Sequence, residues 1–320
     1  MNKPSPNKPA SSLLERASEL YDFGAIFRRK YPVASNPSAD LPSSVPPTAV
    51  VLPEQIAAPT RSTPPSREAA TPSINAPCQM IDRAHLVAQN FLLPDGPVTG
   101  LSEEFRIVKR QLLLAARGGK GVEAVPFGER ILVCSANPDE GKTFCAINLA
   151  LSMANEKDNR VLLVDADFPK PSVLKALGIN SRPGFMDALA DPKCDVESLV
   201  IPTDIDGLSI LPAGGQSNLD TEYLAATRTE QVIDELSRND PARIIIFDSP
   251  PALAASPASV LALHVGQILM VVHADVTTEH ALRDALSLLS GCEHVQLLLN
   301  RAKFSPSGRQ FGNYYRYGAA

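Results

Sequence analysis

A short polar loop beginning at Ser135 carries residue types that bind phosphate. Its sequence, SANPDEGKT, ends in Gly141, Lys142 and Thr143, the last three positions of the pattern G-x-x-x-x-G-K-[ST]. In such a loop the backbone N–H groups surround phosphate oxygens, the lysine neutralises them, and the hydroxyl side chain offers an oxygen to Mg²⁺. Ala136 replaces the first glycine of the pattern, and its methyl group is small enough to be tolerated at the entry of the loop. The predicted nucleotide contacts are Ala136, Asn137, Pro138, Asp139, Glu140, Gly141, Lys142, Thr143 and Phe144.

Three aspartates follow apolar runs elsewhere in the chain. The run VLLVDAD ends in Asp165 and Asp167, and the run IIIFDSP contains Asp248. Asp165 and Asp167 are two residues apart, so both lie on the same side of an extended chain. A helix cap or a turn would explain any one of these aspartates, but it explains all three poorly. Together with the loop they predict a Mg²⁺–nucleotide site with one carboxylate to spare.

These residues need a scaffold that brings them together, and the hydrophobic pattern predicts one. Short runs rich in Val, Ile and Leu alternate with helix-like segments, one of which is KTFCAINLALSMANE directly after the loop. This alternation predicts an α/β fold, a mostly parallel sheet with helices on both faces. In that architecture ligands bind at the carboxyl ends of the strands, where the loop and the aspartates are expected. The predicted strands cover residues 130–136, 160–167, 208–214, 243–250, 267–275 and 295–300.

The composition divides the chain of 320 residues into four parts. Of the 29 prolines, 14 lie in the first 77 residues, and residues 31–78 are predicted to be a disordered linker rich in Pro, Ser and Ala. Residues 1–30 contain a short amphipathic segment, either a docking helix or residual helicity in a disordered tail. Residues 79–303 are expected to form the folded domain, and residues 304–320 a flexible tail.

Charge and hydropathy exclude several classes of protein. The net charge of −5 gives no indication of nucleic-acid binding, and the five cysteines show no C-x-x-C pairing that would favour a zinc site. No apolar run approaches the roughly 20 residues needed to span a bilayer, and the N-terminus lacks a signal-peptide core. We therefore expect a cytoplasmic protein.

The loop and the two aspartate runs together resemble the Walker A, Walker A′ and Walker B motifs of the bacterial tyrosine kinases of polysaccharide export. Those kinases are P-loop proteins akin to the partitioning ATPases. Within that group the chain is most similar to the exopolysaccharide (PEP-CTERM/exosortase-associated) tyrosine autokinases. The resemblance covers SLLERASEL near the N-terminus and resumes from IDRAHLVAQNFLLPDGP through SEEFRIVKRQLL to LLLN.

The resemblance implies ATP and Mg²⁺ as cofactors and assigns roles to the site residues. Lys142 would neutralise the β- and γ-phosphates, with Asp165 as a candidate base near the metal and Asp167 supporting the same catalytic site. Thr143, Asp165 and Asp248 would hold Mg²⁺, Asp248 through water. Asn300, at the end of the last predicted strand, would contact the adenine.

The family also implies phosphate acceptors in the tail. The last ten residues, FGNYYRYGAA, present a tyrosine cluster, and a flexible segment can enter an active site. A phenol with a pKa near 10 is a weak nucleophile at neutral pH, so it would benefit from a nearby carboxylate. The predicted acceptors are Tyr314, Tyr315 and Tyr317.

The segment EEFRIVK matches the family's E-x-x-R-x-x-R oligomerisation helix as Glu103, Arg106 and Lys109. Lysine in the third position is a departure, because it cannot reproduce the forked pairing of arginine. The resemblance implies a homo-oligomer. From Arg301 to the end the chain has four basic residues and no acidic one, so we expect phosphorylation of this cationic tail to separate the copies. It also implies a membrane-bound, Wzz-like chain-length determinant as activator, which would recruit the chain to the inner face of the cytoplasmic membrane.

Two other functions fit parts of the sequence. A partitioning or Min-type ATPase would act as a dimeric switch on DNA or membrane, but such proteins usually carry a signature lysine at the place held here by Asn137. The tyrosine-rich tail would have no purpose in such a switch. The other alternative is a nucleotide-binding scaffold that signals by assembly without transferring phosphate.

Overall fold

The computed structural model describes residues 78–119, 121–215 and 219–303. The predicted N-terminal segment, the linker except for its last residue, and the predicted tail lie outside the described residues. The helices are α3 (Arg83–Ala88), α4 (Gly100–Arg117), α5 (Lys142–Ala154), α6 (Val173–Ala176), α7 (Phe185–Ala190), the 3₁₀ turn η1 (Val196–Leu199), α8 (Asp220–Ala225), α9 (Thr227–Asn239), α10 (Pro257–Leu261) and α11 (Glu279–Leu288). The strands are β1 (Arg130–Ser135), β2 (Arg160–Asp165), β3 (Ile201–Pro202), β4 (Leu208–Leu211), β5 (Arg243–Asp248), β6 (Gln267–His273) and β7 (Val295–Asn300).

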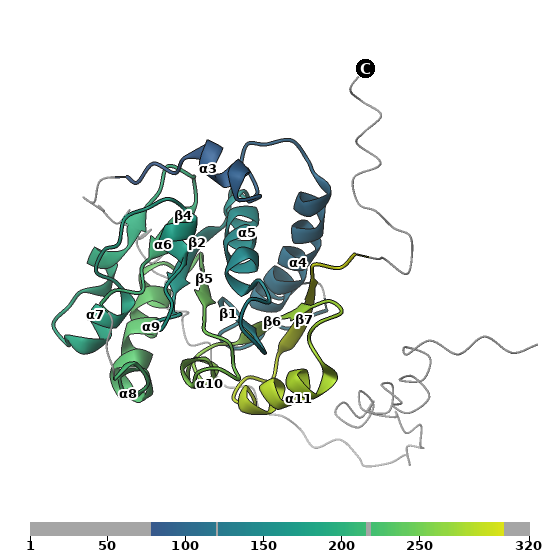
Figure 1. The fold of residues 1–320 in the computed structure, drawn as a ribbon. Helices are drawn as coiled ribbons and strands as arrows, with labels where there is room; N and C mark the ends of the chain where they lie inside the picture. The colour runs from purple at the N-terminus through teal and green to yellow at the C-terminus, as the bar shows by residue number, and fades with distance from the viewer. Residues whose placement is uncertain (1–77, 120, 216–218, 304–320) are drawn as a thin grey trace, which may run out of the picture. The chain divides into compact units, whose positions relative to one another are not determined.

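Within the described residues, these strands form one seven-stranded sheet in the order β3-β4-β2-β5-β1-β6-β7 (Figure 1). Every pairing is parallel except that of β3 with β4. The predicted mostly parallel sheet is therefore confirmed. The sequence pattern did not predict β3, because two residues are too few to show any periodicity.

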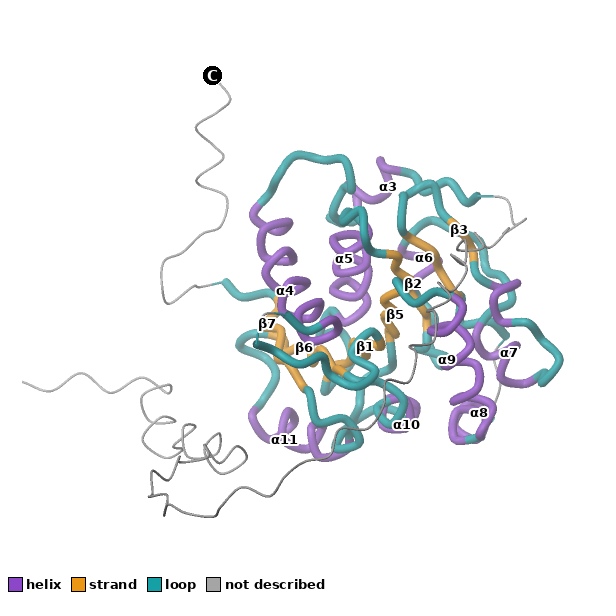
Figure 2. Tube along the Cα trace, turned by 180° about the vertical axis from the view of Figure 1, so that it is seen from behind, coloured by secondary structure: helices purple, strands orange, loops and turns teal. Residues whose placement is uncertain are grey.

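Helices cover both faces of the sheet. Helices α3 to α6 pack on one face and α7 to α11 on the other (Figures 1 and 2). Alternate side chains of β1 enter opposite cores, since Ile131 and Val133 join the α4–α5 side while Leu132 and Cys134 join the other. Because both faces are buried, β1 and β5 are apolar at nearly every position, which explains the continuous hydrophobic runs in the sequence.

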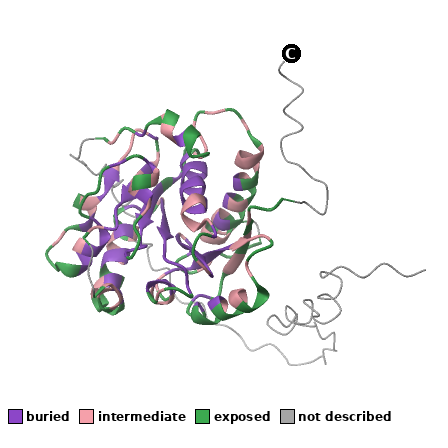
Figure 3. Cartoon of the chain, in the orientation of Figure 1, coloured by how far each residue is buried: buried purple, intermediate pink, exposed green. Residues whose placement is uncertain are grey.

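Helix α5 is the most enclosed of the helices around the sheet. All its residues from Cys145 to Ala154 are buried, whereas α4 and α11 present exposed residues to solvent (Figure 3). Helix α4 begins with a capping box, in which the Thr99 hydroxyl accepts from the Ser102 N–H and the Ser102 hydroxyl accepts from the Thr99 N–H. None of the helices among the described residues combines the length and hydrophobicity needed to cross a membrane.

Candidate nucleotide-binding site

The loop between β1 and α5 is held in shape by a buried glutamate. Glu140 is 2% exposed, and its carboxylate accepts from the Asn137 N–H at 3.1 Å and from the Asn137 amide at 3.0 Å. It also accepts from the Thr277 hydroxyl, which follows β6, at 2.6 Å. Three donors fix this charge, so the Glu140 side chain shapes the loop. Only the backbone of Glu140 is therefore available to contact a nucleotide.

Gly141, the retained glycine of the loop, has a φ of +95°, a left-handed conformation that favours glycine. A Cβ atom here would collide with the side-chain amide of Asn300. That amide donates to the Glu140 carbonyl at 2.9 Å and so joins the end of β7 to the loop. The glycine is therefore required by its left-handed backbone and by the side chain of Asn300.

Lys142 begins α5, and its ammonium lies 2.6 Å from a carboxylate oxygen of Asp167. Burial on its own would lower the pKa of Lys142, but the nearby charges of Asp248 and Asp167 outweigh it and raise the pKa. The side chain therefore remains a cation at neutral pH. It lines a cavity at the start of α5, and its contact with phosphate stays a prediction.

Asp165 ends β2 and lies opposite Asp248 of β5 in the register of the sheet. One of its oxygens, Oδ2, accepts from the N–H groups of Ser172 and Val173, each at 2.9 Å. The other, Oδ1, accepts a longer bond of 3.3 Å from the Asp167 N–H. Burial raises the pKa of Asp165 to about 6, although the backbone donors oppose the shift.

Asp248 is fully buried at the end of β5, and neither of its carboxylate oxygens has a hydrogen-bond partner among the described residues. Burial raises its pKa to about 7, against the opposing charge of Lys142. The Thr143 hydroxyl also opposes this shift, but its hydrogen bond is to the Ser172 hydroxyl at 3.1 Å. An unpartnered buried carboxylate is costly unless a cation joins it.

Such a carboxylate beside a hydroxyl suits Mg²⁺, which proteins usually hold through one or two carboxylates together with phosphate oxygens and water. No cluster of three or more His, Cys, Asp or Glu residues suited to a metal occurs in the part of the chain that the structure describes. The residues therefore fit a metal that arrives with a nucleotide better than one held by protein ligands alone.

A cavity of about 250 Å³ opens at the start of α5, between the loop and the end of β2. The predicted site residues that line it are Asp139, Gly141, Lys142, Thr143, Phe144 and Asp167. Sequence reasoning missed three other lining residues, and the signal for two of them was available. Lys170 and Ser172 lie in the segment DADFPKPS directly after β2, and Arg301 follows β7 at the same edge of the sheet. The full lining is Asp139, Gly141, Lys142, Thr143, Phe144, Asp167, Lys170, Ser172 and Arg301.

A neighbouring cavity of about 470 Å³ lies between α4, the start of α5 and the end of β7. Phe144, Asn300 and Arg301 line it, together with apolar side chains of α4 such as Phe105 and Val108. Phe144 also stacks on Phe91, with ring centroids 5.5 Å apart. Asn300 thus faces an apolar cavity beside the phosphate loop, the kind of environment that the predicted adenine contact needs.

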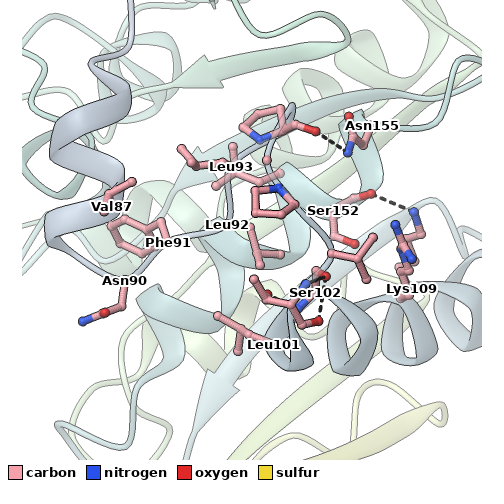
Figure 4. Close-up of a pocket in the computed structure, with 17 residues that line it drawn as sticks. Val87, Asn90, Phe91, Leu92, Leu93, Leu101, Ser102, Lys109, Ser152 and Asn155 are labelled. Atoms are coloured by element: carbon pink, nitrogen blue, oxygen red, sulfur yellow. Dashed lines mark hydrogen bonds between the residues drawn. The ribbon is translucent and has the colours of Figure 1, made fainter. Parts of the chain in front are cut away.

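The predicted oligomerisation residues lie on α4. Arg106 forms an ion pair with Glu103 one turn away, and both are partly exposed. Lys109, in contrast, is buried: its ammonium donates to the Ser152 carbonyl and pairs with Glu156, both at 2.9 Å. Figure 4 shows Lys109 reaching from α4 to Ser152, at the far end of α5 from the phosphate loop. Within this chain Lys109 therefore joins α4 to α5. Of the three predicted oligomerisation residues, only Glu103 and Arg106 have side chains accessible to another copy.

The predicted acceptors Tyr314, Tyr315 and Tyr317 lie outside the described residues.

Comparison with known proteins identifies the fold family. A family model described as an AAA domain matches residues 131–302, more than half of the chain. The chain belongs to the AAA domain family.

Named relatives of this AAA domain are tyrosine kinases. The tyrosine-protein kinase wzc of Salmonella typhimurium is 31% identical over 190 residues, which cover 58% of this chain and 26% of that protein. The tyrosine-protein kinase YwqD of Bacillus subtilis is 25% identical over 235 residues, which cover 73% of this chain and 94% of that protein. This chain thus spans about a quarter of the Salmonella kinase and nearly all of the Bacillus one.

Solved structures agree with these relatives. The kinase domain of VpsO is 27% identical and superimposes with a TM-score of 0.53, covering 63% of this chain and 96% of that domain. The resemblance to the bacterial tyrosine kinases, inferred from the three motifs, is confirmed.

Proposed function

We propose that this AAA domain is an ATP-dependent protein-tyrosine kinase that phosphorylates the tyrosines of its own C-terminal segment. The observation that carries the proposal is the buried carboxylate of Asp248, which has no hydrogen-bond partner among the described residues and lies opposite Asp165 beside the phosphate loop. The names of the matched relatives support the same reaction. Residues 79–303 would be the kinase domain, which the linker of residues 31–78 joins to the N-terminal segment.

Each site residue has a role in this reaction. Lys142 and the backbone of the loop bind the phosphates of ATP, with Lys170 and Arg301 adding positive charge at the rim of the same cavity. Asn300 and Phe144 bound the cavity that would take the adenine. Bound Mg²⁺, held through Thr143, Asp165 and Asp248, would offset the negative charge that develops on the phosphates.

Two aspartates complete the catalytic roles. Asp167 holds the Lys142 ammonium in place. Asp165 would receive the proton of the tyrosine hydroxyl, since its carboxylate ends β2 opposite Asp248, beside the phosphate loop.

The acceptors would be Tyr314, Tyr315 and Tyr317. Phosphorylation adds roughly −1.5 to −2 charges at each tyrosine and would reverse the cationic character of the segment. We propose that copies of the chain assemble through the partly exposed Glu103 and Arg106 on α4, and that modification of the segment separates them. A Wzz-like chain-length determinant would activate the kinase at the inner face of the cytoplasmic membrane and couple it to exopolysaccharide export.

The test is a phosphotyrosine assay on the purified chain with Mg²⁺ and ATP, alone and with the cytoplasmic segment of a candidate partner. The Lys142→Met variant and a variant with all three tail tyrosines changed to Phe are the controls. We expect a signal in the wild type that both variants lose. Signal lost only in Lys142→Met would keep the kinase and move the acceptor elsewhere. ATP hydrolysis without phosphotyrosine under every condition would reject the kinase in favour of a partitioning-type switch.

A further inference from the structure

The two ends of the sheet differ in how their outer edges are protected. At one end, β3 is two residues long, contains Pro202, and lies beside a bridge between Gln79 and Thr203. At the other end, β7 is six residues long, and its sequence VQLLLN contains neither a charged residue nor a proline (Figure 1). Proteins usually protect an edge strand by shortness, charge or proline, because an open edge pairs with further strands. The β7 edge has none of these protections.

Every second residue of β7 turns its backbone polar groups away from the sheet. The carbonyl of Asn300 faces β6, where it accepts from the Ala274 N–H at 2.9 Å. The N–H and C=O of one strand residue point to the same side, and this side alternates along the strand, so the groups of Leu297 and Leu299 point outward. In the part of the chain that the structure describes, β7 has a neighbouring strand on its β6 side only. The outer side can therefore accept another strand.

The exposed side chains of β7 make the same edge apolar. Leu297 is 58% exposed and Leu299 is 60% exposed, although both belong to a strand of the central sheet. An added strand would bury part of these side chains and also pair with the outward backbone groups. Aromatic residues opposite aliphatic ones stabilise neighbouring strands, so an aromatic segment suits this edge best.

The segment that follows β7 begins beside this edge. Only Arg301, Ala302 and Lys303 lie between β7 and residues 304–320. The sequence SPSG at residues 305–308 has the residue preferences of a type I turn, with Ser first, Pro second and Gly fourth. The sequence therefore predicts that the chain reverses direction shortly after β7.

The residues after this predicted turn suit a strand. Residues 309–317, RQFGNYYRY, include Phe311 and three tyrosines, and they contain no proline and no acidic residue. Phenylalanine and tyrosine are favoured in strands. Nine extended residues span about 30 Å, whereas the six residues of β7 span about 20 Å. The segment is therefore long enough to cover the whole β7 edge.

We propose that residues 309–317 add to the outer edge of β7 as an antiparallel strand, which makes eight strands in the sheet. The added strand pairs with the outward backbone groups of Leu297 and Leu299 and covers their side chains. Closing the connection costs little entropy, because the loop between the two strands is short. The pairing needs neither nucleotide nor phosphate transfer, so it does not depend on the proposed kinase function.

The experiment measures amide hydrogen exchange, resolved by residue, in the full chain without nucleotide. The test variant combines Phe311→Pro with Tyr314→Pro, which removes two backbone donors from the proposed strand. One of these positions is even and the other odd, so one of the lost donors faces β7 in either register. Both substitutions lie outside residues 78–303 and leave the described fold unchanged. The matched control is Ala319→Pro, which places a proline beyond the proposed strand.

The expected signature is an alternation along β7. In the test variant, the outward amides of Leu297 and Leu299 should exchange at least about tenfold faster than in the wild type. The amides of Gln296 and Leu298, which face β6, should change by less than about twofold. The Ala319→Pro variant should match the wild type at all four amides.

Three other results would overturn the proposal. Equally fast exchange at Leu297 and Leu299 in the wild type and the test variant would leave the edge to a partner outside the chain. Protection that the test variant keeps, and that increases with protein concentration, would assign the edge to a second copy. Faster exchange at all four amides of the test variant would indicate a general loosening of β7. None of these measurements involves phosphate, so a failure of the kinase function would not change their outcome.

Discussion

The buried carboxylates of the phosphate loop and of the neighbouring strand ends differ in their hydrogen bonding. Glu140 in the loop is buried with three donors around it, from Asn137 and Thr277. Asp248, at the end of β5, is equally buried and has no hydrogen-bond partner in the described part of the chain. The Glu140 carboxylate is therefore fully paired within the chain and holds the loop in shape. The Asp248 carboxylate is available to a group that the chain does not supply. Under the proposed function, the loop is thus held in shape where phosphate would bind, and Asp248 lacks a partner where a cation would bind.

The variant Asp248→Asn tests this difference most strongly, because it removes the unpaired charge. We expect phosphotransfer to fall by about 100-fold or more, because the carboxylate proposed to hold the metal is lost. The nucleotide-free protein should gain about 1 kcal/mol in unfolding free energy, because a charge that burial disfavours is removed. Kinase assays and urea unfolding measure the two effects. Asp206→Asn, at an exposed loop position, is the control and should change neither. A destabilised but fully active Asp248→Asn would contradict the contrast.

Glu140→Gln tests the other side of the comparison. The amide keeps the shape of the side chain but loses the charge that strengthens three hydrogen bonds, so the loop should loosen. We expect the Kd for ATP to rise about tenfold and the unfolding free energy to fall by about 1–2 kcal/mol. Calorimetric titration with ATP and urea unfolding check both numbers. Thr277→Val, which removes one of the three donors, should show a smaller change in the same direction. Wild-type ATP affinity in Glu140→Gln would show that the loop keeps its shape without this charge.

The unpaired burial of these strand-end aspartates should also affect how the unfolding free energy changes with pH. Burial raises the pKa of Asp165 to about 6 and of Asp248 to about 7, from 3.8, so the folded state binds more protons than the unfolded state between about pH 4 and 7. The unfolding free energy from these groups therefore falls as the pH rises through that window, by at most about 1.4 kcal/mol per pH unit for each group. Urea unfolding in the presence of a chelator, without nucleotide, measures it. Asp248→Asn should flatten the curve, and identical curves for the two proteins would rule out the raised pKa.

The smallest effect is expected at Lys109. Lys109→Met leaves the Ser152 carbonyl without its donor and should cost about 1 kcal/mol of unfolding free energy. Lys109→Arg keeps the charge and tests whether the ammonium itself is required. Urea unfolding gives the stability. If Lys109→Met also abolished self-association while leaving stability unchanged, the residue would belong to a contact between copies instead.

The sequence predicted the parallel sheet and the strand-end aspartates because both follow from local patterns. Continuous apolar runs require burial on both faces, and a phosphate loop requires a strand before it and a helix after it. The predicted strands extend past the observed ends of β2 and β5, because the polar residues there leave the sheet to build the site.

What the sequence could not show is pairing across long separations. Glu140 and Thr277 are 137 residues apart, and Lys109 and Ser152 are 43 apart, so neither bond has a local pattern. Lys109 was predicted from the resemblance to face a neighbouring copy, and only the packing of α4 on α5 shows its side chain turned inward. The sequence predicted that Glu140 belongs to the loop. It did not predict that the Glu140 side chain holds the loop in shape.

The bond from Lys109 to Ser152 has a mechanical consequence. Helix α5 is 13 residues long, about 20 Å, with the phosphate loop at its first residue and the Lys109 anchor near its last. Because the hydrogen bond from Lys109 joins α4 to that far end of α5, anything that binds the outer surface of α4 is linked through one buried helix to the loop at its first residue.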